Sequence, residues 1–321
     1  MKRLLPIILI SAVLGTILPT GCDTSTVNES SNLNATQKIS IVTTTTQVAD
    51  IVNRLVGTSC SVVTLMGPGT DPHSYKPTAH DMTAISTGDM VIYHGLKFEG
   101  KLASILSNGQ SKVTSYAISS TVPKELLLDS DEEEGKYSDP HIWFSPKLWE
   151  ICIEGVSEFL IEELPEMKEE IIAKKRSIIV DMKEVSEWAT SQLRSIPEEK
   201  RILITSHDAF RYLGQSFDVE VIALQGISTL QEAGLSDRTN LVDFINKKKV
   251  NCLFIESSVN PKALQEIAKE TGTDIGAPLY SDAYGSADSK STGPNQKSYP
   301  HNTWEGMLVY NILTIMDGLS L

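Results

Sequence analysis

The amino-acid sequence predicts an α/β fold with two lobes, each built on a mostly parallel sheet, joined by one long helix. The chain has 321 residues, 40% of them hydrophobic, which suits a soluble protein with two lobes better than one small core. Short β-branched runs alternate with helical patterns in both halves, which is typical of βα units. A segment free of proline and glycine, residues 166–196, lies between the halves.

The first lobe is predicted over residues 38–164. Its expected strands are KISIVTTTT, SVVTLM, MVIYHG and KVTSYAI, which are rich in β-branched residues or apolar throughout. Its expected helices are VADIVNRLVG, AHDMTAIS and GKLASILS, and Gly57 is expected to end the first of them.

The joining helix is predicted over residues 165–197. Its apolar residues recur three, four or seven positions apart, as on one face of an amphipathic helix: Ile171, Ile178, Met182, Val185, Ala189, Leu193 and Ile196. A single helix here would be roughly 45 Å long at 1.5 Å per residue. A broken pair of helices is the alternative, and we favour the single helix that joins the lobes.

The second lobe is predicted over residues 198–321. Its expected strands are RILITSH, VEVIAL, VNCLFIESS and GAPLYSD, and its expected helices are DRTNLVDFINKKK, PKALQEIAKETG and TWEGMLVYNILTIMDGL. Asp237 is expected to cap the first of these helices, and Pro261 and Gly272 to begin and end the second. The polar segment SADSKSTGPNQKS is expected to be a loop.

The N-terminus predicts export and a lipid anchor. Lys2 and Arg3 precede an apolar run that is too short for a membrane span, and LPTGC follows it. A small residue before Cys22 resembles a lipoprotein cleavage site, although Pro19 stands where leucine is usual. We expect a signal peptide over 1–21, lipidation of Cys22 and a flexible Ser/Thr/Asn-rich tether over 22–37. An ordinary signal peptide or a short membrane anchor is the alternative.

Charge and cysteine content exclude other classes. The net charge of −13 argues against a nucleic-acid-binding protein, which would need a basic surface. Cys60, Cys152 and Cys252 lie far apart in apolar contexts, so we expect buried free thiols, with one disulfide left open. No CxxC pair is present to suggest a thiolate metal site.

The tripeptide Asp-Pro-His occurs twice, ending at His73 and His141. Proline fixes its own φ and restricts the residue before it, and the aspartate can accept hydrogen bonds from backbone amides just ahead. The tripeptide is therefore a stiff bracket that presents its histidine at a set angle, as a metal ligand requires. Turn-forming Asp-Pro units with incidental histidines are the alternative, which the repetition disfavours.

His207 and Asp282 follow predicted strands of the second lobe. They lie at carboxyl ends of strands, where open α/β sheets place their ligands. His73, His141, His207 and Asp282 are separated by 68, 66 and 75 residues, so each comes from a different βα unit. Three imidazoles and one carboxylate suit a first-row divalent cation.

Other polar residues are weaker candidates. Asp288 is the runner-up to Asp282 as fourth ligand. Glu256 and Asp208 are candidate hydrogen-bond partners of the ligands, with capping or ion pairing as the alternative. The remaining histidines are expected at the surface or near the core: His80, His94 and His301.

Seven stretches in order resemble one family: MGPGTDPHSYKPTAHD, GLKFEGKL, DPHIWFSPKLW, SHDAFRYLG, LQGISTLQEAG, FIESSVNPKAL and PLYSDAYG. From residue 38 to its end the chain resembles the TroA-like and ZnuA-like (cluster A-I) solute-binding lipoproteins of bacterial zinc and manganese ABC importers. The resemblance implies a metal ion in the cleft between the lobes, held by His73, His141, His207 and Asp282. Many manganese-binding members carry glutamate in place of His207, and zinc-specific members often carry a His-rich loop where this chain has LDSDEEEGKYS.

The resemblance implies capture of an ion rather than catalysis. We expect a monomeric extracytoplasmic receptor, lipid-anchored to a bacterial membrane in the periplasm or at the cell surface. It would bind Zn²⁺ and/or Mn²⁺, with iron as a further candidate, and deliver the ion to the permease of an ABC transporter. The alternatives are a zinc-dependent hydrolase with Glu256 as its base, and a metal-binding protein of cell adhesion. The absence of an HExxH motif disfavours the hydrolase.

Overall fold

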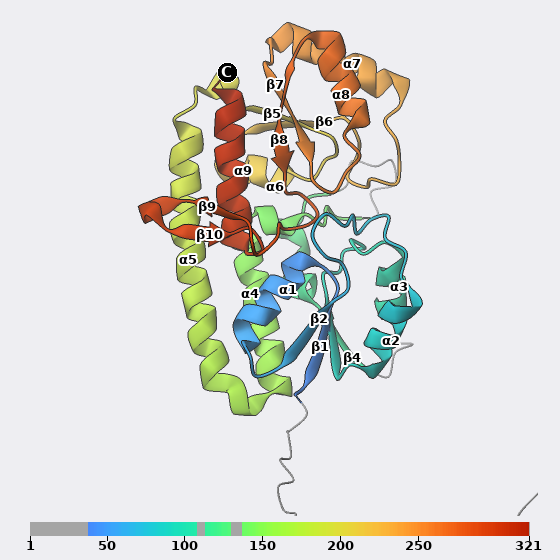
Figure 1. Ribbon diagram of the computed structural model, residues 1–321, viewed down its shortest axis with the longest axis vertical. Helices are drawn as coiled ribbons and strands as arrows, with labels where there is room; N and C mark the ends of the chain where they lie inside the picture. The colour runs from blue at the N-terminus through green and yellow to red at the C-terminus, as the bar shows by residue number, and fades with distance from the viewer. Residues whose placement is uncertain (1–37, 108–112, 130–136, 321) are drawn as a thin grey trace, which may run out of the picture. The chain divides into compact units, whose positions relative to one another are not determined.

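The computed structural model describes residues 38–107, 113–129 and 137–320 (Figure 1). The predicted signal peptide, Cys22 and the tether lie outside the described residues. None of the helices within the described ranges is both long enough and apolar enough to span a bilayer.

The first lobe contains a sheet of four parallel strands in the order β2-β1-β3-β4. The strands are β1 Ser40–Thr43, β2 Ser61–Thr64, β3 Met90–Tyr93 and β4 Thr114–Ala117. The helices between them are α1 Thr46–Val56, α2 Ala79–Thr87 and α3 Lys101–Ser107. Every strand and helix predicted for this lobe is present.

The second lobe repeats this topology with the order β6-β5-β7-β8, again parallel throughout. The strands are β5 Ile202–Thr205, β6 Glu220–Ala223, β7 Cys252–Glu256 and β8 Asp274–Leu279. The helices are α6 Arg211–Phe217, α7 Leu235–Lys248, α8 Lys262–Thr271 and α9 Trp304–Leu319. In both sheets the strand order reverses beside the first strand, so the connections on either side diverge and open a crevice at the carboxyl ends.

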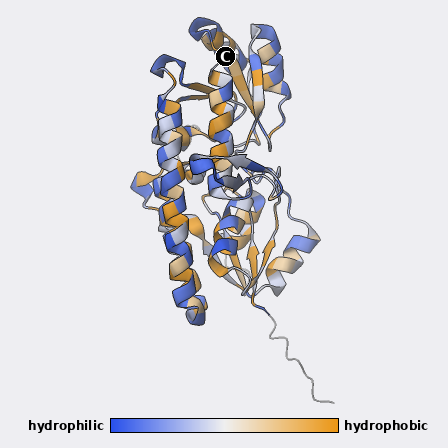
Figure 2. Cartoon of the chain, turned by 60° about the vertical axis from the view of Figure 1, so that its left-hand side comes forward, coloured by the Kyte–Doolittle hydropathy of each residue, from blue (hydrophilic) through white to orange (hydrophobic). Residues whose placement is uncertain are grey.

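The long helix is continuous. α5 spans Lys168–Arg194, 27 residues, or roughly 40 Å at 1.5 Å per residue. Its buried residues are those predicted from the apolar spacing: Ile171, Ile178, Met182, Val185, Ala189 and Leu193. Polar residues alternate with these along the helix (Figure 2). The buried face packs against α1, α4 and α9, so one helix contacts elements of both lobes.

Two features differ from the prediction, and helix α4, Pro146–Glu163, has no bounds in it. Ser145 caps α4 through the backbone N–H of Leu148, and proline occupies its first position. The expected loop after β8 contains an antiparallel hairpin, β9 Lys290–Thr292 and β10 Ser298–Pro300. Asp237 is not the cap of α7: the cap position is Gly234, whose N–H Asp237 accepts from within the first turn.

A large apolar core joins the lobes. It contains the buried indoles of Trp143, Trp149 and Trp304 together with residues of α1, α4, α5 and α9. Cys60, Cys152 and Cys252 are buried free thiols, as expected. Short 3-10 segments complete the chain: Ile118–Thr121, Lys124–Leu126, Ile142–Phe144, Pro165–Met167, Glu198–Lys200 and Pro294–Gln296.

Candidate metal site

Four side chains from four βα units converge at one point. His73, His141, His207 and Asp282 each offer one ligand atom, and these atoms all lie within 4.8 Å of one another. Nε2 of His73 is 3.4 Å from Nε2 of His141. An Asp282 oxygen is 3.3 Å from Nε2 of His141, and its other oxygen is 3.2 Å from Nε2 of His207.

The topology explains this convergence. His73 follows β2, His141 follows β4 and the 3-10 turns beyond it, His207 follows β5, and Asp282 follows β8. All of these strands end at the crevice between the two sheets. His73 is 7% exposed and the other three are fully buried, so water contributes little to their solvation.

Both histidine brackets have the predicted turn. The backbone N–H of His73 donates to Oδ1 of Asp71 at 2.9 Å, and the backbone N–H of His141 donates to Oδ1 of Asp139 at the same distance. Each aspartate therefore bonds two residues ahead across its proline, which fixes the histidine backbone.

Carboxylates orient two of the imidazoles. Nδ1 of His141 donates to Oδ1 of Asp139 at 2.7 Å, which leaves Nε2 directed at the site. Nδ1 of His207 is 2.5 Å from Oε2 of Glu256, an ion-pair contact rather than an aligned hydrogen bond. The other Glu256 oxygen accepts the backbone N–H groups of Ser206 and His207. Such partners fix the tautomer of a ligand and raise its basicity.

The predicted partner Asp208 lies differently. Its carboxylate is 3.8 Å from Arg211, and its pKa is raised to about 6 by burial and by the charge of Asp139. The ring contact of Asp139 was not foreseen. The tripeptide alone does not determine this contact, because Asp71 in the identical tripeptide accepts the hydroxyls of Ser74 and Thr229 with its second oxygen.

The electrostatics of the four groups are complementary. Burial lowers the pKa of His73 to about 4. Burial also opposes protonation of His141, but Asp139 and Asp282 outweigh it and raise its pKa to about 9. The negative charges of Asp282 and Glu256 likewise outweigh burial and raise the pKa of His207. The pKa of Asp282 is held well below its ordinary value, because His207 and His141 outweigh the effect of its burial. The site is thus built to hold positive charge beside Asp282.

The other candidates lie elsewhere. Asp288 and His80 are exposed. His94 is fully buried and donates from Nε2 to the carbonyl oxygen of Pro140 at 2.7 Å. His301 is only 6% exposed, not at the surface as expected, because its ring bonds Tyr280 and Ser291.

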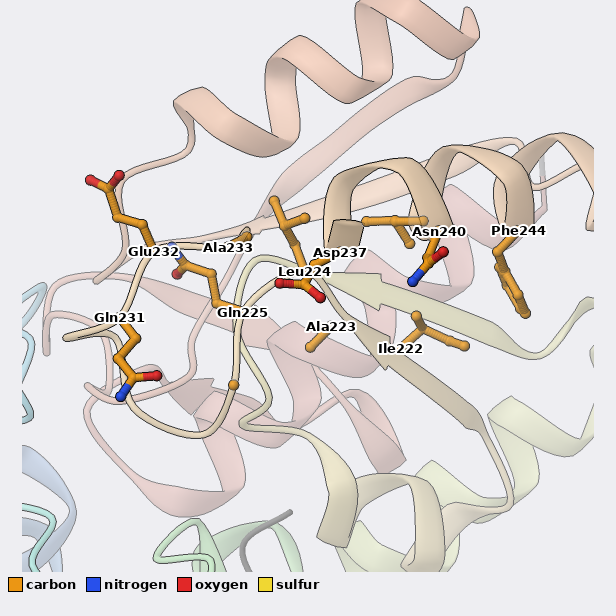
Figure 3. Close-up of a pocket in the computed structure, with 12 residues that line it drawn as sticks. Ile222, Ala223, Leu224, Gln225, Gln231, Glu232, Ala233, Asp237, Asn240 and Phe244 are labelled. Atoms are coloured by element: carbon orange, nitrogen blue, oxygen red, sulfur yellow. The ribbon is translucent and has the colours of Figure 1, made fainter. Parts of the chain in front are cut away.

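Two hollows are candidates for access to the site. One, of about 490 Å³, is lined by residues of both lobes that include His73, Pro140 and Ile227, so it leads from the surface to the site. Another, of about 530 Å³, lies between β6 and α7 and contains none of the four candidates (Figure 3). The first hollow therefore offers the route to the four candidate ligands.

Comparison with known families agrees with this geometry. Residues 41–318 match the family model described as ZnuA, zinc-uptake complex component A, periplasmic. The chain belongs to the ZnuA family. The ZnuA match spans both lobes and includes all four converging side chains.

Individual relatives within the ZnuA family carry different metals in their names. The manganese-binding lipoprotein MntA of Bacillus subtilis is 35% identical over 97% of this chain and 98% of its own length. The zinc-binding protein TroA of Treponema pallidum is 34% identical over 87% of this chain and 88% of its own. The structure of periplasmic zinc-binding TroA superposes with a TM-score of 0.81 at 32% identity, covering 88% of this chain and 99% of TroA.

Proposed function

We propose that this protein is the extracytoplasmic metal-ion receptor of an ABC importer. Its cargo would be one divalent ion held by His73, His141, His207 and Asp282. The supporting observation is that these four buried side chains direct their ligand atoms to within 4.8 Å of one another. The neutral form of each imidazole is the ligand, so binding an ion releases the protons that His141 and His207 carry.

The donor set accepts both Zn²⁺ and Mn²⁺. Three imidazole nitrogens favour zinc over manganese on affinity, by the Irving–Williams order. Asp282 has two oxygens facing the histidines, which suits an ion of higher coordination number such as Mn²⁺. MntA and TroA, named for manganese and zinc, are almost equally similar to this chain. We propose zinc and manganese as alternative cargoes, with iron as a further candidate.

The names of two relatives, both called lipoproteins, support the proposed cellular location. We propose that Cys22 is lipidated and holds the protein, as a monomer, at the outer face of a bacterial membrane. From there it would pass its ion to the permease of the same transporter.

The alternatives are less well supported. A hydrolase would need a general base, and Glu256 already accepts two backbone N–H groups and contacts the ring of His207. An adhesin would need a binding surface that the four ligands do not supply. We propose no catalytic role.

Metal counting tests the proposal. Purified protein is stripped with a chelator, offered Zn²⁺ and Mn²⁺ together, and analysed for bound ions per chain. One tightly bound ion in the wild type, lost in His207→Ala and kept in the exposed control His80→Ala, is the expected result. A wild type that retains no stoichiometric ion would reject the proposed function.

A further inference from the structure

The fourth candidate ligand is attached to the first lobe, although the sequence assigns it to the second. The side-chain amide of Gln47, on α1, donates from Nε2 to the main-chain oxygen of Asp282 at 2.8 Å. These two residues are 235 positions apart, and both are fully buried. A buried amide donor is costly to leave unpaired, so this bond constrains the backbone of Asp282.

A second bond holds the same loop on the other side of Ala283. The hydroxyl of Thr46 accepts the backbone N–H of Tyr284 at 2.8 Å and donates to Oε1 of Gln47 at 3.1 Å. Thr46 and Gln47 are the first two residues of α1. Together they form a clamp, which we define as these two side chains and their bonds to the backbone of Asp282 and Tyr284.

Helix α1, which carries the clamp, is itself held in place by helix α9. Arg54, at the other end of α1, makes two hydrogen bonds to Glu305 of α9, at 2.7 and 3.0 Å. Asn311 of α9 in turn bonds both the N–H and the carbonyl of Tyr280. The loop that carries Asp282 is therefore held from α1 and α9, and α1 and α9 are held to each other.

We propose that Thr46 and Gln47 are positioning residues that fix the orientation of the Asp282 carboxylate and thereby set the preference between zinc and manganese. This inference rests on the proposed function. The hydrogen bonds of the clamp to the loop reach backbone atoms, so their effect on an ion passes through the direction in which Asp282 points.

The two ions depend on Asp282 to different degrees. Zn²⁺ takes imidazole nitrogens readily and keeps three ligands when the carboxylate is misdirected. Mn²⁺ favours oxygen donors and a larger coordination number, so it depends on both Asp282 oxygens being correctly placed. Loosening the clamp should therefore weaken manganese binding more than zinc binding.

The test uses nearly isosteric variants of the clamp. Thr46→Val removes the hydroxyl but keeps the shape, and Gln47→Met removes the amide but keeps the length. Thr46→Ser restores the hydroxyl and is the rescue. Thr271→Val removes a hydroxyl that bonds Ile267 and Thr273 at the end of α8, and is the matched control.

Affinities for Zn²⁺ and Mn²⁺ and the Co²⁺ absorption spectrum are measured for each metal-free protein, with melting temperature as a check on folding. We expect the manganese affinity of Thr46→Val and Gln47→Met to fall about tenfold to hundredfold, as for loss of an outer partner of a ligand. Zinc affinity should fall by much less, and the Co²⁺ spectrum should change. Thr46→Ser and Thr271→Val should match the wild type.

Unchanged affinities in both clamp variants would overturn the inference, as would an equal loss for the two ions, which indicates only a structural role. If Gln47→Met does not fold, the comparison of Thr46→Val with Thr46→Ser decides the question. A wild type that binds neither ion rejects the proposed function itself, and that result is distinct from any difference among the variants.

Discussion

Asp71 and Asp139 occupy the same position in two identical tripeptides, and each accepts the backbone N–H of the histidine that follows at 2.9 Å. Their remaining contacts differ. Asp139 is fully buried and also accepts Nδ1–H of His141. Asp71 is partly exposed, and its second oxygen accepts the hydroxyls of Ser74 at 2.8 Å and Thr229 at 2.7 Å.

The second lobe contacts both brackets, but in different ways. Thr229 lies between β6 and α7 and reaches the Asp71 carboxylate, whereas Tyr212 of α6 donates its hydroxyl to the main-chain oxygen of Asp139. The Asp71 carboxylate thus bonds the two lobes together through Thr229, a contact that we call the latch. The Asp139 carboxylate instead raises the pKa of the His141 ring.

The consequence is two histidines of opposite character. His73 has a pKa lowered to about 4 by burial, and His141 has a pKa raised to about 9 because Asp139 and Asp282 outweigh burial. The tripeptide determines how stiffly the histidine is presented. The surroundings of the tripeptide determine whether the ring carries a proton before an ion arrives.

The largest expected effect is a steep pH dependence of ion affinity. At neutral pH His141 and His207 hold protons in the ion-free protein, and His73 does not. Binding should then release about two protons, so affinity should rise about a hundredfold per pH unit near neutrality. Calorimetry in buffers of different ionisation enthalpy measures the protons released. A pH-independent affinity between about pH 6 and about pH 8 would contradict the assigned proton positions.

Replacing the aspartate of each Asp-Pro-His tripeptide by asparagine separates the roles of the two aspartates. Asp139→Asn keeps an oxygen for the backbone N–H of His141 but lowers the basicity of its ring, so ion affinity should fall about tenfold to hundredfold. Proton release should fall toward one, because the pKa of His141 falls toward its ordinary value. Asp71→Asn removes no hydrogen bond to a ring, so proton release should stay near two, and affinity should fall by no more than the roughly fivefold expected for the bond to Thr229. Equal effects of the two variants in a calorimetric titration would remove the distinction between the brackets.

Much of this site could be predicted from the sequence, for a physical reason. Both sheets have short β-branched or apolar strands, and a polar residue just after a parallel strand reaches the crevice wherever the strand lies in the sheet. His207 and Asp282 satisfy that condition, whereas His73 and His141 follow longer connections and are indicated by the repeated Asp-Pro-His tripeptide. Glu256 also satisfies the condition, and it lies against His207.

What could not be predicted depends on distant contacts. Gln47 reaches Asp282 across 235 residues, and nothing in its local sequence distinguishes it from other helix residues. The hairpin β9–β10 has polar three-residue strands without apolar alternation, so its register depends on packing against α9 rather than on a local pattern. Helix α4 is different, because Ser145 and Pro146 are a local start signal that can be read without any distant contact.

A smaller effect tests the latch between the lobes. Thr229→Val removes the hydroxyl that donates to Asp71. Losing this hydrogen bond between the lobes should cost about 1 kcal/mol of free energy in the ion-bound state, so the ion should dissociate about fivefold faster. Ser74→Ala removes the other hydroxyl on the same carboxylate oxygen but lies in the same lobe as Asp71, so it is the matched control and should leave the rate unchanged. Stopped-flow release into excess chelator measures both. Equal acceleration in the two variants would indicate that the oxygen matters only to the local turn.

The smallest expected effect is on the stability of the ion-free protein, where the two brackets should give opposite pH slopes. His73 has a folded pKa of about 4, below its ordinary value of 6.5, so its contribution to stability is lost as pH falls from 6.5 toward 4. His141 has a folded pKa of about 9, so its contribution is complete below pH 6.5 and is lost as pH rises through 9.

Differences between variants isolate these slopes from other buried groups, such as Asp50, whose pKa is raised to about 7 chiefly by burial. The melting temperature of the wild type minus that of His73→Gln should decrease by a few degrees at acid pH only. The melting temperature of the wild type minus that of His141→Gln should decrease by a few degrees at alkaline pH only. If both melting-temperature differences change with pH in the same direction, the two histidines lie in equivalent surroundings. That result would contradict the different contacts of Asp71 and Asp139.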